Sequence, residues 1–235
     1  LGGYAMTAIT ALTAQNTQGV FGIHPVPTSF LAQQISLVLD DIGADAIKTG
    51  MLHSAEVIET VVDTIGGPSV PLIVDPVMVA KGGSALLEDR AVHALRTLLI
   101  PRATLLTPNL PEASLLIGRP IVNLADMEAA IAPLRALGAQ YVLLKGGHLA
   151  GDAITDILIT PSDTVHFTSQ RLDTPHTHGT GCTLASALAT FLGAGMGIEK
   201  AVEKARDYVH RAIAAAPGFG RGHGPLGHNF SLPEA

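Results

Sequence analysis

A glycine-flanked threonine just before a helical pattern is the segment best suited to chemistry. It has the sequence HGTGCT, from His178 to Thr183, and leads straight into the apolar run 184–188. Two glycines let the backbone turn tightly and approach a ligand closely. A helix beginning here would direct free N–H groups and its positive dipole end at the turn, which suits a phosphate or the charge of phosphoryl transfer. The segment includes Gly179, Thr180, Gly181 and Cys182. By itself, the pattern fits a capped glycine loop equally well.

Cys182 is the only cysteine of the chain and falls in the first turn of that predicted helix. A helix N-terminus lowers the pKa of a thiol, whereas a docked phosphate would oppose this, so Cys182 is a candidate base. The alternative is a small buried hydrophobic residue. A single cysteine excludes a disulfide within the chain and fits a reducing cytoplasm.

Three polar residues, Asp75, Asn109 and Lys145, each directly follow an apolar run of the kind that forms a buried strand. Ligands of parallel sheets bind beyond the carboxyl ends of the strands. We therefore expect these three side chains to meet at one edge of the sheet. A lysine there holds a phosphate as a point charge, although a solvated loop lysine is the alternative.

Asn109 and Glu112 are three residues apart, which places them on one side of a first helical turn. Amide and carboxylate oxygens suit Mg²⁺, often through waters. A turn followed by a glutamate that the helix dipole favours is the alternative.

Gln15 and Met51 follow the first two apolar runs. The amide can pair with a ring that presents a donor beside an acceptor, and the methionine can pack against a flat ring. On chemistry alone, turn and core roles explain both residues better. The ten histidines lack a cysteine pair or a His-Glu-x-x-His helix, so no zinc site is expected.

The elements that must position these residues alternate between strand and helix. Predicted helices cover 29–42, with Ser29 as a cap, 55–65, 89–99, 112–117, 124–137, 182–192 and 198–215. Predicted strands cover 44–49, 70–79, 103–107 and 141–144, and an antiparallel hairpin covers 153–159 and 164–169. The run 4–14 is predicted as a strand, or as the end of a helix that runs into one. This order predicts an α/β fold with a mostly parallel sheet and helices on both faces. The length of 235 residues suits one domain over 1–235.

Composition narrows the function classes. Hydrophobic residues make up 47% and charged residues 14%, the opposite of a disordered chain. The net charge is −6 and the 14 Lys and Arg are scattered, which argues against nucleic-acid binding. No apolar run approaches the roughly 18 residues of a membrane span, so no membrane partner is expected.

Seven motifs together resemble the hydroxymethylpyrimidine kinase / phosphomethylpyrimidine kinase family of thiamine biosynthesis, within the ribokinase-like superfamily. The resemblance runs from Leu1 to about Phe230, and the motifs are modest singly but very specific jointly. In chain order they are TALTAQNTQGV, ADAIKTGML, VDPVMVAKGG, LLTPNLPEA, VLLKGGHL, THGTGCTLASALA and GHGPLGHN.

The resemblance implies ATP- and Mg²⁺-dependent phosphorylation of 4-amino-5-hydroxymethyl-2-methylpyrimidine and then of its monophosphate. Cys182 would be the base, beside an anion hole formed by residues 179–182. The nucleotide would be contacted by Lys145, Thr180 and Asn109, and Mg²⁺ would lie near Asn109, Glu112 and Asp75. Gln15 and Met51 would contact the pyrimidine. Residues 79–84 would form a flap over the site. A homodimer is expected by analogy alone.

The chain departs from the family pattern at its front. Members begin with a strand and a Gly-rich turn, about 30 residues on the scale of a βαβ unit. This sequence opens at Leu1, so part of the substrate pocket and one strand of the sheet are expected to be missing.

Three other functions compete with this hypothesis. A pyridoxal kinase acts on a related hydroxymethyl ring, and Cys182 and the Gln15 segment favour the pyrimidine over it. A catalytically silent ligand-binding module is plausible because of the missing front. A dehydrogenase is disfavoured because no Gly-x-Gly-x-x-Gly follows a strand.

Overall fold

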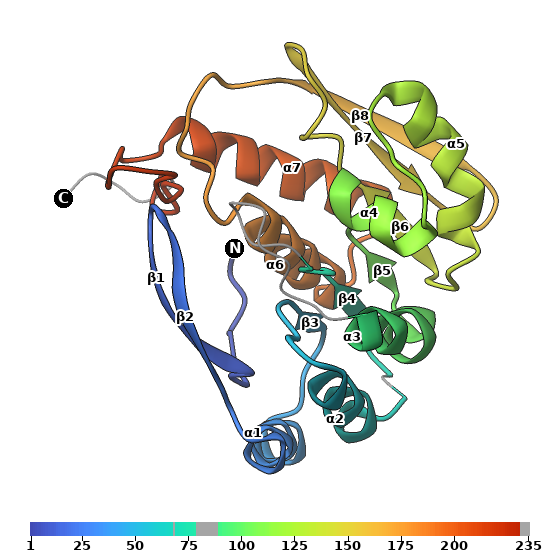
Figure 1. Cartoon of the computed structure of the whole chain (residues 1–235), viewed down its shortest axis with the longest axis vertical. Helices are drawn as coiled ribbons and strands as arrows, with labels where there is room; N and C mark the ends of the chain where they lie inside the picture. The colour runs from blue at the N-terminus through green and yellow to red at the C-terminus, as the bar shows by residue number, and fades with distance from the viewer. Residues whose placement is uncertain (68, 79–88, 231–235) are drawn as a thin grey trace.

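The computed structural model describes residues 1–67, 69–78 and 89–230. A mixed six-stranded sheet lies at its centre, in the order β3-β4-β5-β6-β7-β8 (Figure 1). The first four strands run parallel to one another: β3 (Ile47–Thr49), β4 (Leu72–Val74), β5 (Leu105–Leu106) and β6 (Tyr141–Leu144). The last two add antiparallel: β7 (Ala153–Ile159) and β8 (Thr164–Gln170). The predicted mostly parallel sheet with an antiparallel hairpin is confirmed.

Helices cover both faces of this sheet, as predicted. One face packs against α1 (Thr28–Asp41), α2 (Ala55–Ile65), α3 (Asp89–Ala94), α4 (Leu110–Ile117) and α5 (Leu124–Arg135). The other packs against α6 (Thr180–Gly193) and α7 (Ile198–Ala214). Strand residues alternate between the two cores. On β4, Leu72 and Val74 enter the first core and Ile73 enters the second.

The parallel strands are shorter than the apolar runs that predicted them. The run 70–79 yields only Leu72–Val74, and 103–107 yields only Leu105–Leu106. Pro71 and Pro76 flank β4, and proline cannot donate a hydrogen bond to a neighbouring strand. Apolar loop residues beside a strand are buried as well, so the pattern overstates strand length.

Several predicted helix boundaries also differ from the structure: α4 begins at Leu110 instead of 112, and α5 ends at Arg135 instead of 137. Ser29 is not a cap, because α1 begins at Thr28 with Pro27 at the N-cap position. The predicted helix 89–99 is α3 followed by a widened π-helical turn, Leu95–Leu99, and a 3₁₀ turn, Ile100–Arg102. Pro101 lies in that last turn, where its missing N–H ends the helical hydrogen bonding.

A separate antiparallel hairpin precedes α1 and was only half predicted. Its first strand, β1 (Ala11–Asn16), is shorter than the run 4–14, and its second, β2 (Gly19–Pro25), was not predicted. Two glycines and a proline make β2 a poor strand by composition. In Figure 1 the hairpin forms an arm that reaches from α1 to the C-terminal segment.

The tip of this hairpin is held by the glycine-rich segment 217–228. The N–H of His223 donates to the carbonyl of Thr17 at 2.8 Å. A Cβ at Gly220 or Gly222 would collide with Thr17, so the two segments touch backbone to backbone. The same segment accepts a hydrogen bond from the N–H of His178 through Gly224. The hairpin therefore reaches the approach to α6.

Candidate active site

Asp75, Thr107 and Lys145 meet where β4, β5 and β6 end. Lys145 Nζ lies 3.0 Å from Asp75 Oδ1, and Thr107 Oγ1 donates to the same oxygen at 3.1 Å. Each of the three lies two positions after a residue of the core beneath α6 and α7. Those residues are Ile73, Leu105 and Leu143. Strand alternation therefore turns all three side chains toward α6.

The Lys145–Asp75 ion pair is buried, with side-chain exposures of 14% and 2%. Burial by itself lowers the pKa of Lys145, but the carboxylates of Asp75 and Glu112, with a smaller contribution from Cys182, outweigh it. The pKa of Lys145 is therefore raised and the side chain is cationic. The Lys145 ammonium group is thus a positive charge that is largely shielded from bulk water.

The first turn of α6 lies next to this ion pair. Gly179 occupies the N-cap position in the left-handed region, at φ 83°, with no side-chain cap. A Cβ built on Gly181 would lie 3.3 Å from Lys145 Nζ and 3.8 Å from Asp75 Oδ2. The first N–H groups of a helix have no intrahelical acceptor. The predicted donors 179–182 thus lie beside the lysine that sequence reasoning paired with them.

Cys182 is exposed and free, which rules out the buried-hydrophobe interpretation. It lines an open groove of about 390 Å³ that follows α6 and includes Thr183, Ser186 and Tyr208. The neighbouring residue Gly181 lies beside Lys145, since a Cβ built on it would stand 3.3 Å from the ammonium nitrogen. The thiol therefore combines access to small molecules with a nearby positive charge.

Asn109 and Glu112 form a reciprocal cap at the start of α4. Asn109 Oδ1 accepts from the N–H of Glu112 at 2.9 Å, and Glu112 Oε2 accepts from the N–H of Asn109 at 2.8 Å. Sequence spacing correctly put the two on one turn, and their role as a helix cap is present as well. Glu112 is 4% exposed. Burial raises its pKa to about 7, with Asp75 adding to the shift and Lys145 opposing it.

The two predicted ring-contacting residues belong to different parts of the fold. Gln15 on β1 places Nε2 3.1 Å from His178 Nε2, directly before Gly179. Met51 follows β3, where the N–H of Asp75 donates to the carbonyl of Thr49. The carbonyl of Met51 accepts from Thr10 Oγ1 at 2.9 Å. The predicted flap, 79–84, lies outside the described residues.

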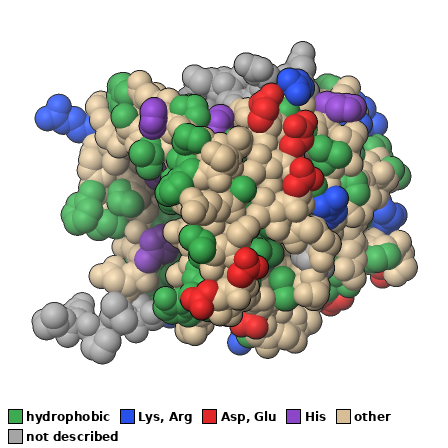
Figure 2. Space-filling view, turned by 90° about the horizontal axis from the view of Figure 1, so that it is seen from below, with side chains coloured by type: hydrophobic (Ala, Val, Ile, Leu, Met, Phe, Trp, Pro, Cys, Tyr) green, Lys and Arg blue, Asp and Glu red, His purple; other side chains and the backbone are tan. Residues whose placement is uncertain are grey.

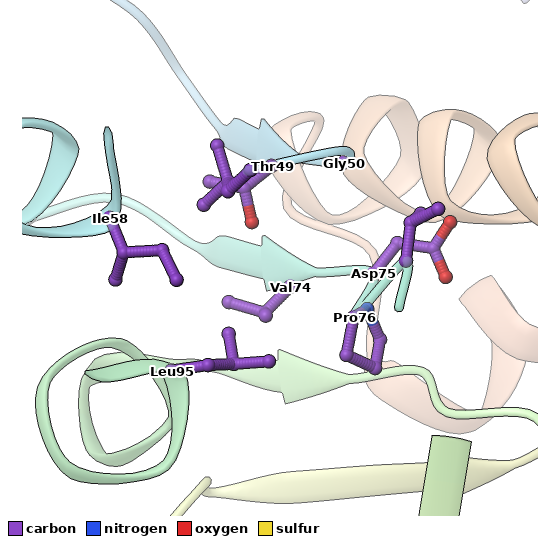
Figure 3. Close-up of a pocket in the computed structure, with 9 residues that line it drawn as sticks. Thr49, Gly50, Ile58, Val74, Asp75, Pro76 and Leu95 are labelled. Carbon is purple, nitrogen blue, oxygen red and sulfur yellow. The ribbon is translucent and has the colours of Figure 1, made fainter. Parts of the chain in front are cut away.

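A cavity of about 10 Å³, the size of one water, lies beside the ends of β3 and β4. Figure 3 shows the Asp75 carboxylate directed away from the apolar lining of Ile58, Val74 and Leu95. The hydroxyl of Thr49 also lines the cavity and has no hydrogen-bond partner among the described residues. The apolar wall leaves Asp75 to face Lys145 and α6.

Sequence reasoning missed the residues that hold the loop after Lys145. Asp156 on β7 accepts the N–H of Gly146 at 2.7 Å and pairs with Arg206 of α7. Arg171 donates to the carbonyls of Gly147, Leu149 and Gly151. One signal was present, since Asp156 interrupts the apolar run AITDILI. A charge in a buried strand needs a partner.

The mixed, mostly parallel sheet with helices on both faces is the fold of ribokinase-like small-molecule kinases, which are phosphotransferases, and its strand ends present the Lys145–Asp75 pair to a glycine-opened helix. The sequence profile of the phosphomethylpyrimidine kinase family matches residues 1–227. The chain therefore belongs to the phosphomethylpyrimidine kinase family.

Individual relatives agree with this assignment. The hydroxymethylpyrimidine/phosphomethylpyrimidine kinase of Streptomyces coelicolor is 46% identical over 100% of this chain and 87% of its own length. The phosphomethylpyrimidine kinase structure from Clostridium difficile superposes with a TM-score of 0.79 at 38% identity, covering 90% of this chain and 87% of its own. An ADP complex of Bacillus subtilis pyridoxal kinase gives 0.88 at 35% identity, covering 96% and 86%. None of the helices in residues 1–67, 69–78 and 89–230 has the length and hydropathy to cross a membrane.

Proposed function

We propose that this protein phosphorylates 4-amino-5-hydroxymethyl-2-methylpyrimidine at its hydroxymethyl oxygen with ATP, and then phosphorylates the monophosphate. The observation that carries the proposal is that the N-terminus of α6 lies beside the Lys145–Asp75 pair, since a Cβ built on Gly181 would stand 3.3 Å from the Lys145 ammonium group. The names of the family and of its relatives supply the substrate.

The N–H groups at residues 179–182 and the ammonium of Lys145 balance negative charge on the transferred phosphoryl group. Phosphoryl transfer requires mostly positioning and electrostatic stabilisation. Because Lys145 is buried, its charge is weakly screened and acts strongly on a phosphate at this position. The proposed nucleotide contacts also include Thr180, the first residue of α6, and Asn109, which forms an isolated β-bridge with Lys145.

Cys182 assists the attacking hydroxyl. As the substrate oxygen forms its bond to the γ-phosphorus, the bond from that phosphorus to the ADP oxygen breaks, and the hydroxyl proton passes to Cys182, the proposed base. ADP leaves with the electron pair of the broken bond. The exposure of Cys182 at the first turn of α6 supports this role, because the base must reach the substrate.

Mg²⁺ would be held through water by Asp75, Glu112 and Asn109. In the described part of the chain, no three His, Cys, Asp or Glu side chains are grouped to hold a metal directly. Asp75 and Glu112 nevertheless influence each other electrostatically, and Mg²⁺ usually keeps several waters beside one or two carboxylates and the substrate phosphates. When bound, the ion neutralises charge on the phosphate oxygens. Asp75, Glu112 and Asn109 orient its waters.

Gln15 and Met51 recognise the pyrimidine. The contact between Gln15 and His178 supports this assignment, because it places an amide next to the site where the hydroxymethyl group reacts. The amide pairs with the ring's adjacent donor and acceptor. Met51 packs on the face of the ring.

A coupled assay of ADP release, with the product identified by mass spectrometry, tests the proposal. We expect turnover of the hydroxymethyl pyrimidine and of its monophosphate when Mg²⁺ and ATP are present. Turnover of neither would reject the proposal and favour a silent ligand-binding module. Pyridoxal is the second substrate to test, since the pyridoxal kinase of Bacillus subtilis superposes with a TM-score of 0.88. A higher kcat/KM with pyridoxal would reverse the substrate order.

The β1–β2 hairpin is the proposed homodimer interface. It exposes Leu12 by 57%, Phe21 by 72% and Ile23 by 42%, an apolar surface that a second copy would cover. Figure 2 shows hydrophobic side chains gathered on the side where the hairpin lies in Figure 1. Light scattering should give twice the chain mass, and Phe21→Asp should halve it. A wild-type monomer at every concentration would contradict the dimer.

We also propose a cytoplasmic location. The reaction consumes ATP, and the proposed base is a thiol that must stay reduced, which the cytoplasm provides. Cell fractionation with an antibody against the chain tests this location, and recovery of the protein outside the cytoplasmic fraction would contradict it.

A further inference from the structure

A buried ion pair lies on the far side of the loop that carries Lys145. Asp156 on β7 is 6% exposed, and its Oδ2 accepts from Arg206 Nε at 2.8 Å. Its other oxygen, Oδ1, accepts the N–H of Gly146 at 2.7 Å. Gly146 immediately follows Lys145, so the Asp156 carboxylate is hydrogen-bonded to the peptide group next to the lysine of the candidate site.

Arg206 is itself held from several directions. Its Nη2 donates to Ser169 Oγ at 3.2 Å and to the carbonyl of Ile154 at 3.5 Å. Its guanidinium carbon lies 5.6 Å from the centre of the Phe167 ring. These contacts come from β7 and β8, whereas Arg206 belongs to α7. The guanidinium therefore has little freedom, and neither does the carboxylate that it pairs with.

The backbone on both sides of Lys145 is fixed. The N–H of Lys145 donates to the carbonyl of Pro108 at 2.9 Å. A Cβ on Gly146 would collide with the carbonyl oxygen of Thr155 and would lie 3.3 Å from Met127 Cε. The loop that follows β6 therefore packs closely against β7. This packing fixes the backbone of Lys145 and so sets the direction of its side chain.

We infer that Asp156 and Arg206 are positioning residues for the kinase reaction, because they fix Lys145 between Asp75 and Gly181. A buried ion pair is weak evidence for stability, since apolar residues of similar size often serve as well. Asp156 also accepts the hydrogen bond from the N–H of Gly146, so the ion pair fixes the position of the loop that carries Lys145. This inference depends on the proposed role of Lys145 at the transferred phosphate.

Asp156→Asn and Arg206→Met test the inference, with Arg206→Lys as the conservative variant. We expect kcat to fall on the order of 10- to 100-fold, as small misplacements of a catalytic group do, while the KM for the pyrimidine stays constant. Arg206→Lys should recover part of the loss. The matched control is Arg135→Met. Arg135 also donates to this hairpin, at Thr160 and Asp163, but near its turn.

A double-mutant cycle with Lys145→Ala separates positioning from general damage. If Arg206 acts through Lys145, Arg206→Met should lower kcat little further in the Lys145→Ala background. Full additivity of the two losses, or an equal loss of kcat in Arg135→Met at a matched thermal unfolding midpoint, would overturn the inference. If Arg206→Met does not fold, Asp156→Asn takes its place in the cycle.

Calorimetric binding of a non-hydrolysable ATP analogue provides a readout that does not need turnover, because the analogue keeps the γ-phosphate at which Lys145 is proposed to act. Lys145→Ala and Asp156→Asn should each weaken binding of the analogue, and the double variant should bind little worse than either. A wild-type chain that binds the analogue without any turnover of ATP would refute the proposed function alone. An affinity for the analogue unchanged in Asp156→Asn but reduced in Lys145→Ala would refute the positioning role alone.

Discussion

Gln15 Nε2 lies 3.1 Å from His178 Nε2, which joins the β1–β2 hairpin to the residue before the α6 N-cap across 163 sequence positions. The amide nitrogen can only donate, so the imidazole nitrogen facing it accepts. The contact links the proposed ring-recognition residue to the proposed phosphate site. A change at either residue is therefore expected to disturb the other.

Breaking this contact should affect the pyrimidine and spare ATP. His178→Ala removes the acceptor, and we expect the KM for the pyrimidine to rise about two- to tenfold, the value of one exposed hydrogen bond. The KM for ATP should not change. Gln18→Ala, at an exposed position near the tip of the same hairpin, is the control. A rise in the KM for ATP instead would show that His178 serves the nucleotide.

Cys182→Ala should lower turnover far more than ATP affinity. General-base assistance is worth about 100-fold or more in kcat, whereas a small exposed side chain contributes little to nucleotide binding. Steady-state kinetics together with calorimetric ATP binding measure the two quantities. Losses of equal size in both would rule out Cys182 as the base.

Gly181→Ala should reduce activity without reducing stability. The backbone of Gly181 is not in the left-handed region, so alanine fits the helix and can stabilise it by up to about 1 kcal/mol. Its methyl group would stand 3.3 Å from Lys145 Nζ, in the space proposed for the phosphate. We expect kcat/KM to fall while the thermal unfolding midpoint holds or rises.

Gly197→Ala is the control for that variant. Gly197 lies at the N-cap of α7 with φ −62°, and a Cβ there meets no atom within 4 Å. It should keep wild-type kinetics. Normal activity in Gly181→Ala would mean that no phosphate oxygen approaches this backbone.

Glu112 should make the free energy of unfolding fall as pH rises. Burial raises its pKa from 4.5 to about 7, so between these values the folded chain holds a proton that the unfolded chain has released. Ionisation above pH 7 then costs up to about 3 kcal/mol. Glu112→Gln removes this cost, so its stability relative to the wild type should improve between pH 4.5 and pH 8.

Denaturant unfolding at several pH values measures this effect, with Glu59→Gln on α2 as an exposed control. Added Mg²⁺ should reduce the difference between Glu112→Gln and the wild type at pH 8, because a nearby cation favours the ionised carboxylate. A constant difference across this pH range would show that Glu112 stays ionised.

Local sequence patterns were sufficient to predict features that depend on a single helix or strand. The segment from His178 to Thr183 predicted the start of α6, although the structure begins the helix two residues earlier than 182, at Thr180. The spacing of Asn109 and Glu112 predicted their common turn. β2 was not predicted, because its pairing with β1, and not its composition, makes it a strand.

By itself, the sequence determined the α/β class, the strand ends that carry Asp75 and Lys145, and the glycine-opened helix. Those features depend on hydrophobic period and backbone freedom, which are local. Only the tertiary structure decided that Thr107 shares Asp75 with Lys145, that Asp156 and Arg206 hold the next peptide, and that Gln15 reaches His178. These contacts join separate elements, and sheet register and helix packing set their distances.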